Sequence, residues 1–191
     1  MSDTYEILGD QSVEPISKRD FCQALGQLAS GVSIITTQQN GDRRGITATA
    51  VCSVSAEPPT LLICTNSATG TSKMIAEAGC FAVNFLEQSQ QEISDRFAGA
   101  AGVQGDARFR PDEWTNSERY GMPLLLGALA QLECRVDRIV ASGSHDVYFG
   151  VIESVSLTPG RPLIYHQGNY LTSVMAADAA QKVHAETGAS A

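Results

Sequence analysis

Hydrophobic residues recur at helical spacing near the start of the chain and at strand spacing through most of the rest. Phe21, Leu25 and Leu28 lie three or four residues apart, so they fall on one face of a helix. Gly31 follows them and is a residue at which such a helix can end. The pattern predicts a helix over residues 17–30.

β-branched residues dominate the segments that come next. Residues 32–37 read as a strand, and Asn40 with Gly41 is a strong hairpin signal before another β-rich run. We therefore expect strand 32–37 to pair with one continuous strand over residues 44–54. The later expected elements are a strand over 60–65, a helix over 71–78, a strand over 80–86, a helix over 88–98, a long loop over 99–120, strands over 126–140 and 145–158, and a short strand over 162–165.

Six or seven strands with helices at the periphery predict a mainly β fold, an antiparallel barrel that we expect to be closed. Residues 1–16 show no sustained period and are interpreted as an N-terminal arm. Residues 17–172 form the expected single domain, and the Ala-rich residues 173–191 form an expected C-terminal helical tail.

Composition narrows the possible partners. The chain of 191 residues carries a formal charge of −8, and no cluster of Lys and Arg offsets it, so nucleic acid is an unexpected partner. No segment approaches the roughly 18 uninterrupted apolar residues of a membrane span, and no leader pattern is seen, which predicts a cytoplasmic protein without a membrane partner. The five cysteines are odd in number and lack C-x-x-C spacing, so we expect reduced and mostly buried thiols.

Small and hydroxylated side chains persist through residues 45–55, where a strand would normally prefer bulk. Small side chains let a flat ligand approach the backbone, and a flavin ring needs such access for its polar edge. A tightly packed sheet would explain the same pattern.

A hydroxyl-rich segment, residues 65–73, leads from a strand into a helix start. Free N–H groups, the helix dipole and Lys73 could hold a flavin phosphate there. Ordinary capping by Ser or Thr is the alternative interpretation.

Two further segments contain polar groups with more than one interpretation. Asn84 lies within an apolar strand, where it either pairs with neighbouring backbone or lines the polar edge of a flavin. Tyr165 and Tyr170 flank a Gly turn, where they either stack on a planar cofactor or close the end of a barrel.

His145 follows a Gly turn at the start of a strand and is the best catalytic candidate. A His there can contact the nicotinamide amide or the cofactor phosphates, and a plain surface His is the alternative. The three histidines are not spaced as a metal site, so no metal is expected. A G-x-G-x-x-G fingerprint is missing from the sequence, which argues against a dedicated Rossmann site for a nicotinamide cofactor.

Several of these motifs, taken in order, resemble the short-chain flavin reductase family over about residues 17–172. The residues that carry this resemblance are 45–55, Pro58 with Pro59, 64–66, 81–86, 96–99, and Ser144 with His145. Within it, the chain is most similar to reductase components of 4-hydroxyphenylacetate 3-monooxygenase. Residues 165–170 are more similar to reductases of phenol and chlorophenol hydroxylases.

The resemblance implies an antiparallel Greek-key split β-barrel, a homodimer that reduces FMN or FAD with NADH or NADPH. It also implies a partner, a flavin-dependent monooxygenase of the aromatic or phenolic hydroxylase type, which receives the reduced flavin. His145 and Tyr170 would meet the nicotinamide. The implied flavin contacts are Thr47, Ala48, Thr49, Ala50, Ser53, Asn66, Ser67, Thr71, Asn84, Phe85 and Leu86. Flavin storage or redox sensing, and an oxidase similar to pyridoxamine-phosphate oxidase, are the rival functions.

Overall fold

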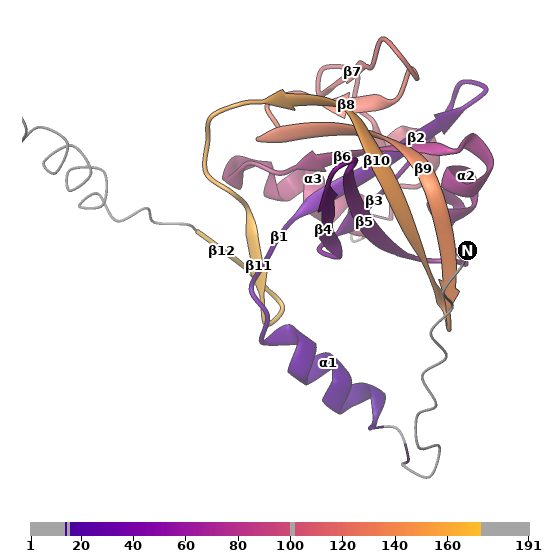
Figure 1. The fold of residues 1–191 in the computed structure, drawn as a ribbon. Coiled ribbons are helices and arrows are strands. Elements are labelled where there is room, and N and C mark those ends of the chain that lie inside the picture. Colours follow the sequence, from indigo (N-terminus) through magenta and orange to yellow (C-terminus); the bar gives the residue numbers. More distant parts are fainter. Residues whose placement is uncertain (1–13, 15, 100–101, 173–191) are drawn as a thin grey trace, which may run out of the picture.

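The computed structural model describes residues 14, 16–99 and 102–172, so the expected N-terminal arm lies almost wholly, and the C-terminal tail wholly, outside the described residues (Figure 1). Its centre is one antiparallel sheet, as predicted. The sheet has seven strands in the order β3 (Asp42–Ala48), β2 (Ser33–Gln39), β6 (Cys80–Phe85), β9 (Ala130–Ser142), β10 (His145–Leu157), β5 (Pro59–Asn66) and β4 (Val51–Ala56).

The two edge strands, β3 and β4, are consecutive in the chain and only Thr49 and Ala50 separate them. The sheet must therefore curl until its edges nearly meet, yet no ladder joins β3 to β4 within the described residues. The barrel is split rather than closed. The expected single strand over 44–54 is wrong for the same reason, because the chain crosses from one edge to the other at Thr49.

The connection between β5 and β6 gives the sheet its Greek-key character. These strands are consecutive in the chain, but β9 and β10 lie between them in the sheet. The helix α2 (Gly70–Ala78) makes the crossing, and Thr69 caps it by accepting a hydrogen bond from the Ser72 N–H. The hairpin of β2 and β3 turns at Asn40 and Gly41, both with positive φ, as the sequence predicts.

A second helix, α3 (Gln91–Ala98), follows the short 3-10 helix η1 (Gln88–Gln90) and packs against β3. The loop after it contains the 3-10 helix η2 (Gly105–Arg108) and a small hairpin of β7 (Trp114–Asn116) and β8 (Pro123–Leu125). Phe97 of α3 contacts Phe109 and Trp114 with ring centroids 5.0 and 5.3 Å away. This aromatic cluster anchors the loop, whose hairpin the sequence did not predict.

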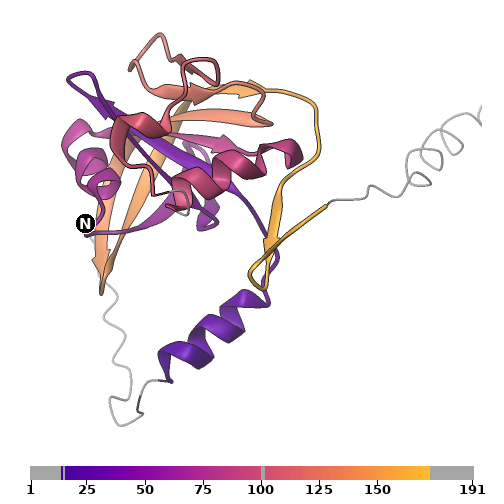
Figure 2. The same cartoon turned by 180° about the vertical axis from the view of Figure 1, so that it is seen from behind.

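The N-terminal helix α1 (Lys18–Gly26) projects from the barrel with a three-stranded sheet of β1 (Ser30–Gly31), β11 (Ile164–His166) and β12 (Asn169–Leu171) (Figures 1 and 2). The helix is shorter than the predicted 17–30 because the chain enters β1 and pairs with β11. No residue of α1 is buried, and Phe21, Leu25 and Leu28 are 53%, 52% and 64% exposed. The predicted apolar face therefore exists, and none of the described residues covers it.

The cysteines are all free thiols, as expected, but only Cys80 and Cys134 are buried. Cys22 and Cys52 are exposed and Cys64 is intermediate, so the expectation of mostly buried thiols is wrong. The exposed pair lies on α1 and on β4.

Candidate functional site

The strand end next to the split brings several predicted residues together. Thr47, Ala48 and Thr49 line a cavity of about 350 Å³, named here the Tyr170 cavity, with Tyr170 on its other side. Its remaining lining residues are Val32, Ser94, Asp95, Ala98, Tyr165 and Gly168. The side chains of β3 are small here, so the β3 backbone is close to the cavity.

Hydrogen bonds fix the walls of the Tyr170 cavity. Thr47 Oγ1 donates to the Ser94 carbonyl at 2.6 Å, which ties β3 to α3. The Tyr170 hydroxyl donates to Asp95 Oδ1 at 2.9 Å and shares a bond of 2.8 Å with Ser94 Oγ. Burial raises the pKa of Tyr170, so its hydroxyl stays protonated at neutral pH. The tyrosine pair does not close the barrel, because Tyr165 and Tyr170 contact each other in the small sheet, 5.2 Å between centroids.

The other side of the split is an apolar groove of about 760 Å³, named here the β4 groove. Thr49, Ala50, Ser53 and Phe85, all predicted flavin contacts, line it together with hydrophobic residues such as Leu61. Thr49 lines both the groove and the Tyr170 cavity. The small residues of the 45–55 segment thus form two adjoining surfaces instead of one.

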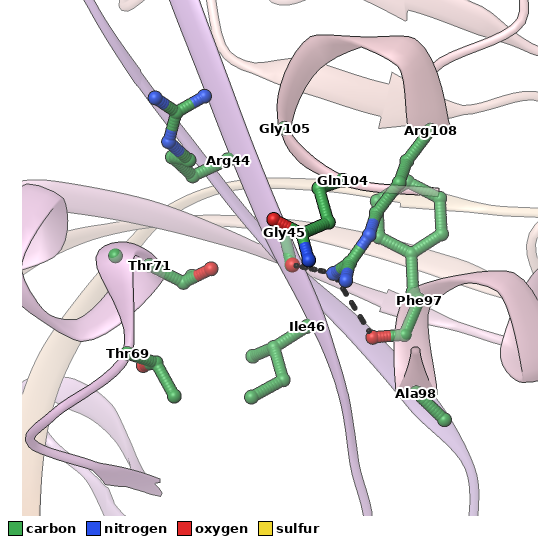
Figure 3. A pocket seen from close by; sticks show the side chains of 11 residues that line it. Arg44, Gly45, Ile46, Thr69, Thr71, Phe97, Ala98, Gln104, Gly105 and Arg108 are labelled. Carbon is green, nitrogen blue, oxygen red and sulfur yellow. Dashed lines mark hydrogen bonds between the residues drawn. The ribbon is translucent and has the colours of Figure 1, made fainter. Parts of the chain in front are cut away.

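A cavity of about 550 Å³ lies at the start of α2, and it is named here the Thr71 cavity (Figure 3). Thr69 and Thr71 stand on one side and Phe97 and Arg108 on the other in Figure 3. Its lining residues are Arg44, Gly45, Ile46, Thr69, Gly70, Thr71, Phe97, Ala98, Gln104, Gly105 and Arg108. The set contains two arginines and no carboxylate.

Backbone donors at this helix start are free to meet a ligand. The Thr69 side chain caps the N–H of Ser72, and the Thr69 carbonyl accepts from the N–H of Lys73. In the part of the chain that the structure describes, the N–H groups of Gly70 and Thr71 have no acceptor. Helix N-termini with such free donors attract phosphate groups. Lys73 is exposed and does not line the cavity, so the phosphate role expected for it lacks support.

Arg108 is held in place by main-chain carbonyls. Its Nε donates to Val103 at 2.8 Å, and its Nη1 donates to Gly45 and Phe97 at 3.4 and 3.3 Å (Figure 3). The guanidinium forms no ion pair among the described residues. Sequence reasoning missed Arg108 and Arg44, because the loop that carries Arg108 is weakly periodic and contains no motif.

Asn66, Ser67 and His145 lie together at the end of the β5–β10 ladder, where Asn66 pairs with His145. Ser67 Oγ donates to the Ser144 carbonyl at 3.1 Å, and the Ser144 hydroxyl lies 2.9 Å from His145 Nδ1. His145 is exposed and follows Gly143, which has φ of +57°, so its expected place at a strand mouth after a Gly turn is confirmed.

Asn84 and Leu86 are buried in the core. The Asn84 amide donates to the Ile34 carbonyl at 3.1 Å, and its oxygen accepts from the Leu125 N–H at 2.8 Å. Of the two interpretations, pairing with neighbouring backbone is the one that this geometry favours for the Asn84 side chain. Any ligand contact from this strand end would come from its backbone or from Phe85.

The two residues expected at the nicotinamide do not converge in one chain. His145 begins β10 at the tip of the β9–β10 hairpin, whereas Tyr170 belongs to β12, and both views show these segments well apart (Figures 1 and 2).

No group of three His, Cys, Asp or Glu residues that could hold a metal ion occurs among residues 14, 16–99 and 102–172. In the same ranges, no helix has the length and apolar character needed to cross a membrane.

Comparison with known proteins agrees with this architecture. Residues 25–173 match the model of the flavin reductase like domain family. The chain belongs to this family. This confirms the resemblance drawn from its motifs, and the split antiparallel barrel confirms the fold class that the resemblance implies.

Individual relatives cover most of the chain. FMN reductase (NADH) RutF 1 of Methylorubrum extorquens is 37% identical over 164 residues, 85% of this chain and 80% of the relative. The 4-hydroxyphenylacetate 3-monooxygenase reductase component of Salmonella typhimurium is 36% identical over 151 residues, 78% of this chain and 88% of the relative. The solved structure of the flavin reductase PheA2 superposes with a TM-score of 0.74 at 32% identity, covering 84% of this chain and all of that chain.

Proposed function

We propose that this flavin reductase family member is an NAD(P)H:flavin oxidoreductase that reduces free FMN or FAD and passes the reduced flavin to a partner flavin-dependent monooxygenase. The observation that carries the proposal is the run of small side chains at the split of the barrel, next to a cavity lined by two arginines and a helix start. A flat ring with a phosphate tail needs those two surfaces side by side.

The donor set fits a flavin. Thr47, Ala48 and Thr49 leave room for a ring in the Tyr170 cavity, where Tyr170 supplies an aromatic face. The free N–H groups at the start of α2 and the two arginines of the Thr71 cavity suit its phosphate. We retain Ala50, Ser53, Asn66, Ser67, Thr71 and Phe85 as proposed contacts, and from Asn84 and Leu86 only the backbone.

A flavin bound there would accept a hydride from the nicotinamide of NADH or NADPH, a two-electron transfer that requires no acid or base from the protein. The chain's own task is to hold the two rings in contact, and such positioning can lower a barrier by several kcal/mol. We assign His145 to the nicotinamide, because its exposed imidazole stands at a strand mouth and lines neither the Tyr170 cavity nor the Thr71 cavity.

We also propose a partner enzyme and a cellular location for this protein. Two-component systems are named among the relatives, including the reductase subunit HsaB of a flavin-dependent monooxygenase in Rhodococcus jostii at 35% identity. We propose an aromatic or phenolic hydroxylase as the recipient of the flavin. The free thiols agree with a reducing compartment, so we propose the cytoplasm as the location.

We further propose that two copies of the chain form the working unit. Among the described residues, Phe21 and Leu25 of α1 are exposed, as are Val54 of β4 and Val155 and Leu157 of β10. Patches of this kind mark interfaces in stable proteins. A second copy would also allow His145 of one chain to approach the Tyr170 cavity of the other, which a single chain does not permit.

One assay separates the reductase from its rivals. Protein is mixed with free flavin and NADH in air, and the absorbance of NADH is followed. Turnover of added flavin supports the reductase. Tight flavin binding without NADH oxidation would instead indicate storage or sensing, and oxygen use that depends on a second substrate would indicate an oxidase.

A further inference from the structure

We propose that Asp95 of α3 makes the site discriminate between the two redox states of the flavin, so that oxidised flavin binds more tightly than reduced flavin. The inference rests on the proposed function, because it gives a residue of the same site a role in releasing the product. The oxidised flavin ring is neutral, whereas the reduced ring carries a negative charge near neutral pH. A fixed carboxylate beside the ring therefore repels only the product.

Asp95 is the charged residue on the wall of the Tyr170 cavity. The other lining residues, among those that the structure describes, are Gly, Ala, Val, Ser, Thr and Tyr. A neutral ring meets small side chains, hydroxyls and an aromatic face in this cavity. An anionic ring meets the same groups and, in addition, one charge of its own sign.

No basic side chain neutralises the Asp95 carboxylate within the described ranges, because none of the ion pairs found there includes it. Arg96, the next residue of α3, pairs instead with Glu113 and Glu92. A carboxylate with a cation partner would present little net charge to a ligand. Without one, the charge of Asp95 acts on whatever occupies the cavity.

Hydrogen bonds hold this carboxylate in place before a ligand arrives. Asp95 is half-buried, and its Oδ1 accepts from the Tyr170 hydroxyl at 2.9 Å. The same hydroxyl lies 2.8 Å from Oγ of Ser94, a fully buried residue whose carbonyl accepts from Thr47 of β3. The network spans the cavity from α3 to β12 and to β3. The carboxylate is therefore fixed beside the strand that we propose contacts the ring.

The repulsion acts at short range. A ring seated in a cavity of about 350 Å³ is close to Asp95 on the scale of the Debye length, about 10 Å at 0.1 M salt. Salt at that concentration therefore screens the repulsion only in part. Weaker binding of the reduced form also lowers the midpoint potential of the bound flavin, and a tenfold difference in affinity corresponds to about 30 mV for a two-electron couple.

The test measures binding rather than turnover. Dissociation constants are obtained by ultrafiltration without oxygen and without NADH, for oxidised FMN and for FMN reduced with dithionite, and in a parallel series for FAD. The phosphates are present in both redox states, so the ratio of the two constants isolates the charge of the ring. The proteins are the wild type, Asp95→Asn and the control Glu92→Gln.

The wild type should bind oxidised flavin about tenfold more tightly than reduced flavin, the scale of one partly screened charge pair. Asp95→Asn should bind both states about equally, because Asn keeps an oxygen for the Tyr170 hydroxyl and loses the charge. Glu92→Gln removes a charge from the same helix at a position that is 70% exposed and outside the cavity lining, so it should keep the wild-type ratio.

A second measurement requires no variant. Raising the salt concentration to 1 M shortens the Debye length to about 3 Å, so the wild-type ratio should fall toward one. Equal affinity of the wild type for both redox states, or an unchanged ratio in Asp95→Asn, would overturn the proposal. Equal weakening of both states in Asp95→Asn would assign Asp95 to a contact common to both and would also overturn it. These outcomes leave flavin reduction by NADH intact, whereas a wild type that binds neither flavin in either state would refute the proposed function as well.

Discussion

Gly45 of β3 lies directly beneath the Phe97 ring of α3. A Cβ atom added at Gly45 would be 2.7 Å from Phe97 Cε1, and 3.2 Å from the Ile35 carbonyl oxygen. The absence of a side chain therefore lets α3 pack onto β3, and it brings Ala98 to the two cavities that α3 and β3 share.

We predict that Gly45→Ala destabilises the fold by about 1–3 kcal/mol, because the extra methyl group overpacks a contact that both the core and the cavities use. Urea denaturation measures the change. Gly31→Ala is the matched control, since nothing lies within 4 Å of a Cβ at Gly31. Equal stability of the two variants would show that α3 is free to move away from β3.

Glu113→Ala should cost about 3 kcal/mol of stability. Glu113 Oε1 accepts from Arg96 Nη2 at 2.8 Å, and the side chains are 17% and 5% exposed. Its removal leaves a buried guanidinium without its main partner. Glu92→Ala removes a 70% exposed partner of Arg96 and should cost less than about 1 kcal/mol. Thermal unfolding of both variants decides this, and similar losses would contradict the importance of the buried pair.

His145→Ala should raise the KM for NADH, or lower kcat/KM by about 1–2 kcal/mol, while flavin affinity stays nearly constant. The reason is that His145 lines neither of the cavities assigned to the flavin. Substitution of Thr47, which lines the Tyr170 cavity, should do the reverse. Steady-state kinetics with varied NADH, combined with flavin titration, measures both effects. Unchanged NADH kinetics, or an equal loss of flavin affinity, would show that His145 does not serve the nicotinamide.

Light scattering should give a mass of twice the 20.3 kDa of the chain. Leu25→Asp on α1 should shift the protein toward the monomer and reduce NADH oxidation, because it places a charge on the apolar face. Gln23→Asp on the opposite side of the same helix is the control and should remain a dimer. A wild-type monomer with full activity would refute the two-chain site.

The sequence predicted most strands of the seven-stranded sheet and the hairpin of β2 and β3, because β-branched runs and the turn at Asn40 and Gly41 are local signals. It did not predict β1, β7, β8 or β12. It also located the strand that we propose contacts the flavin ring, since an unusual run of small side chains can be recognised without knowledge of the fold. The interruption between β3 and β4 at Thr49 could not be predicted from the sequence, because it depends on where the two edges of the folded sheet come close to each other. The curl that brings these edges near each other is set by pairings between strands far apart in sequence, such as β5 with β10.

The cationic cavity escaped prediction for a related reason. Arg44 belongs to a hairpin, whereas Arg108 belongs to a weakly periodic loop. The two side chains reach one cavity only because Phe97, Phe109 and Arg108 pack together in the folded chain. The uncovered helix α1 shows the opposite case. Its amphipathic pattern was predicted correctly, but none of the described residues covers its apolar face.

The central claim, that the protein reduces free flavin and releases it, is tested most directly under anaerobic conditions. Flavin is supplied in large molar excess over the protein, NADH is added, and the absorbances of NADH and of oxidised flavin are followed together. We predict that one NADH is consumed for each flavin until the whole excess is reduced, because the reduced flavin leaves and a new one enters. Reduction that stops at one flavin per chain, or that never begins, would contradict the account.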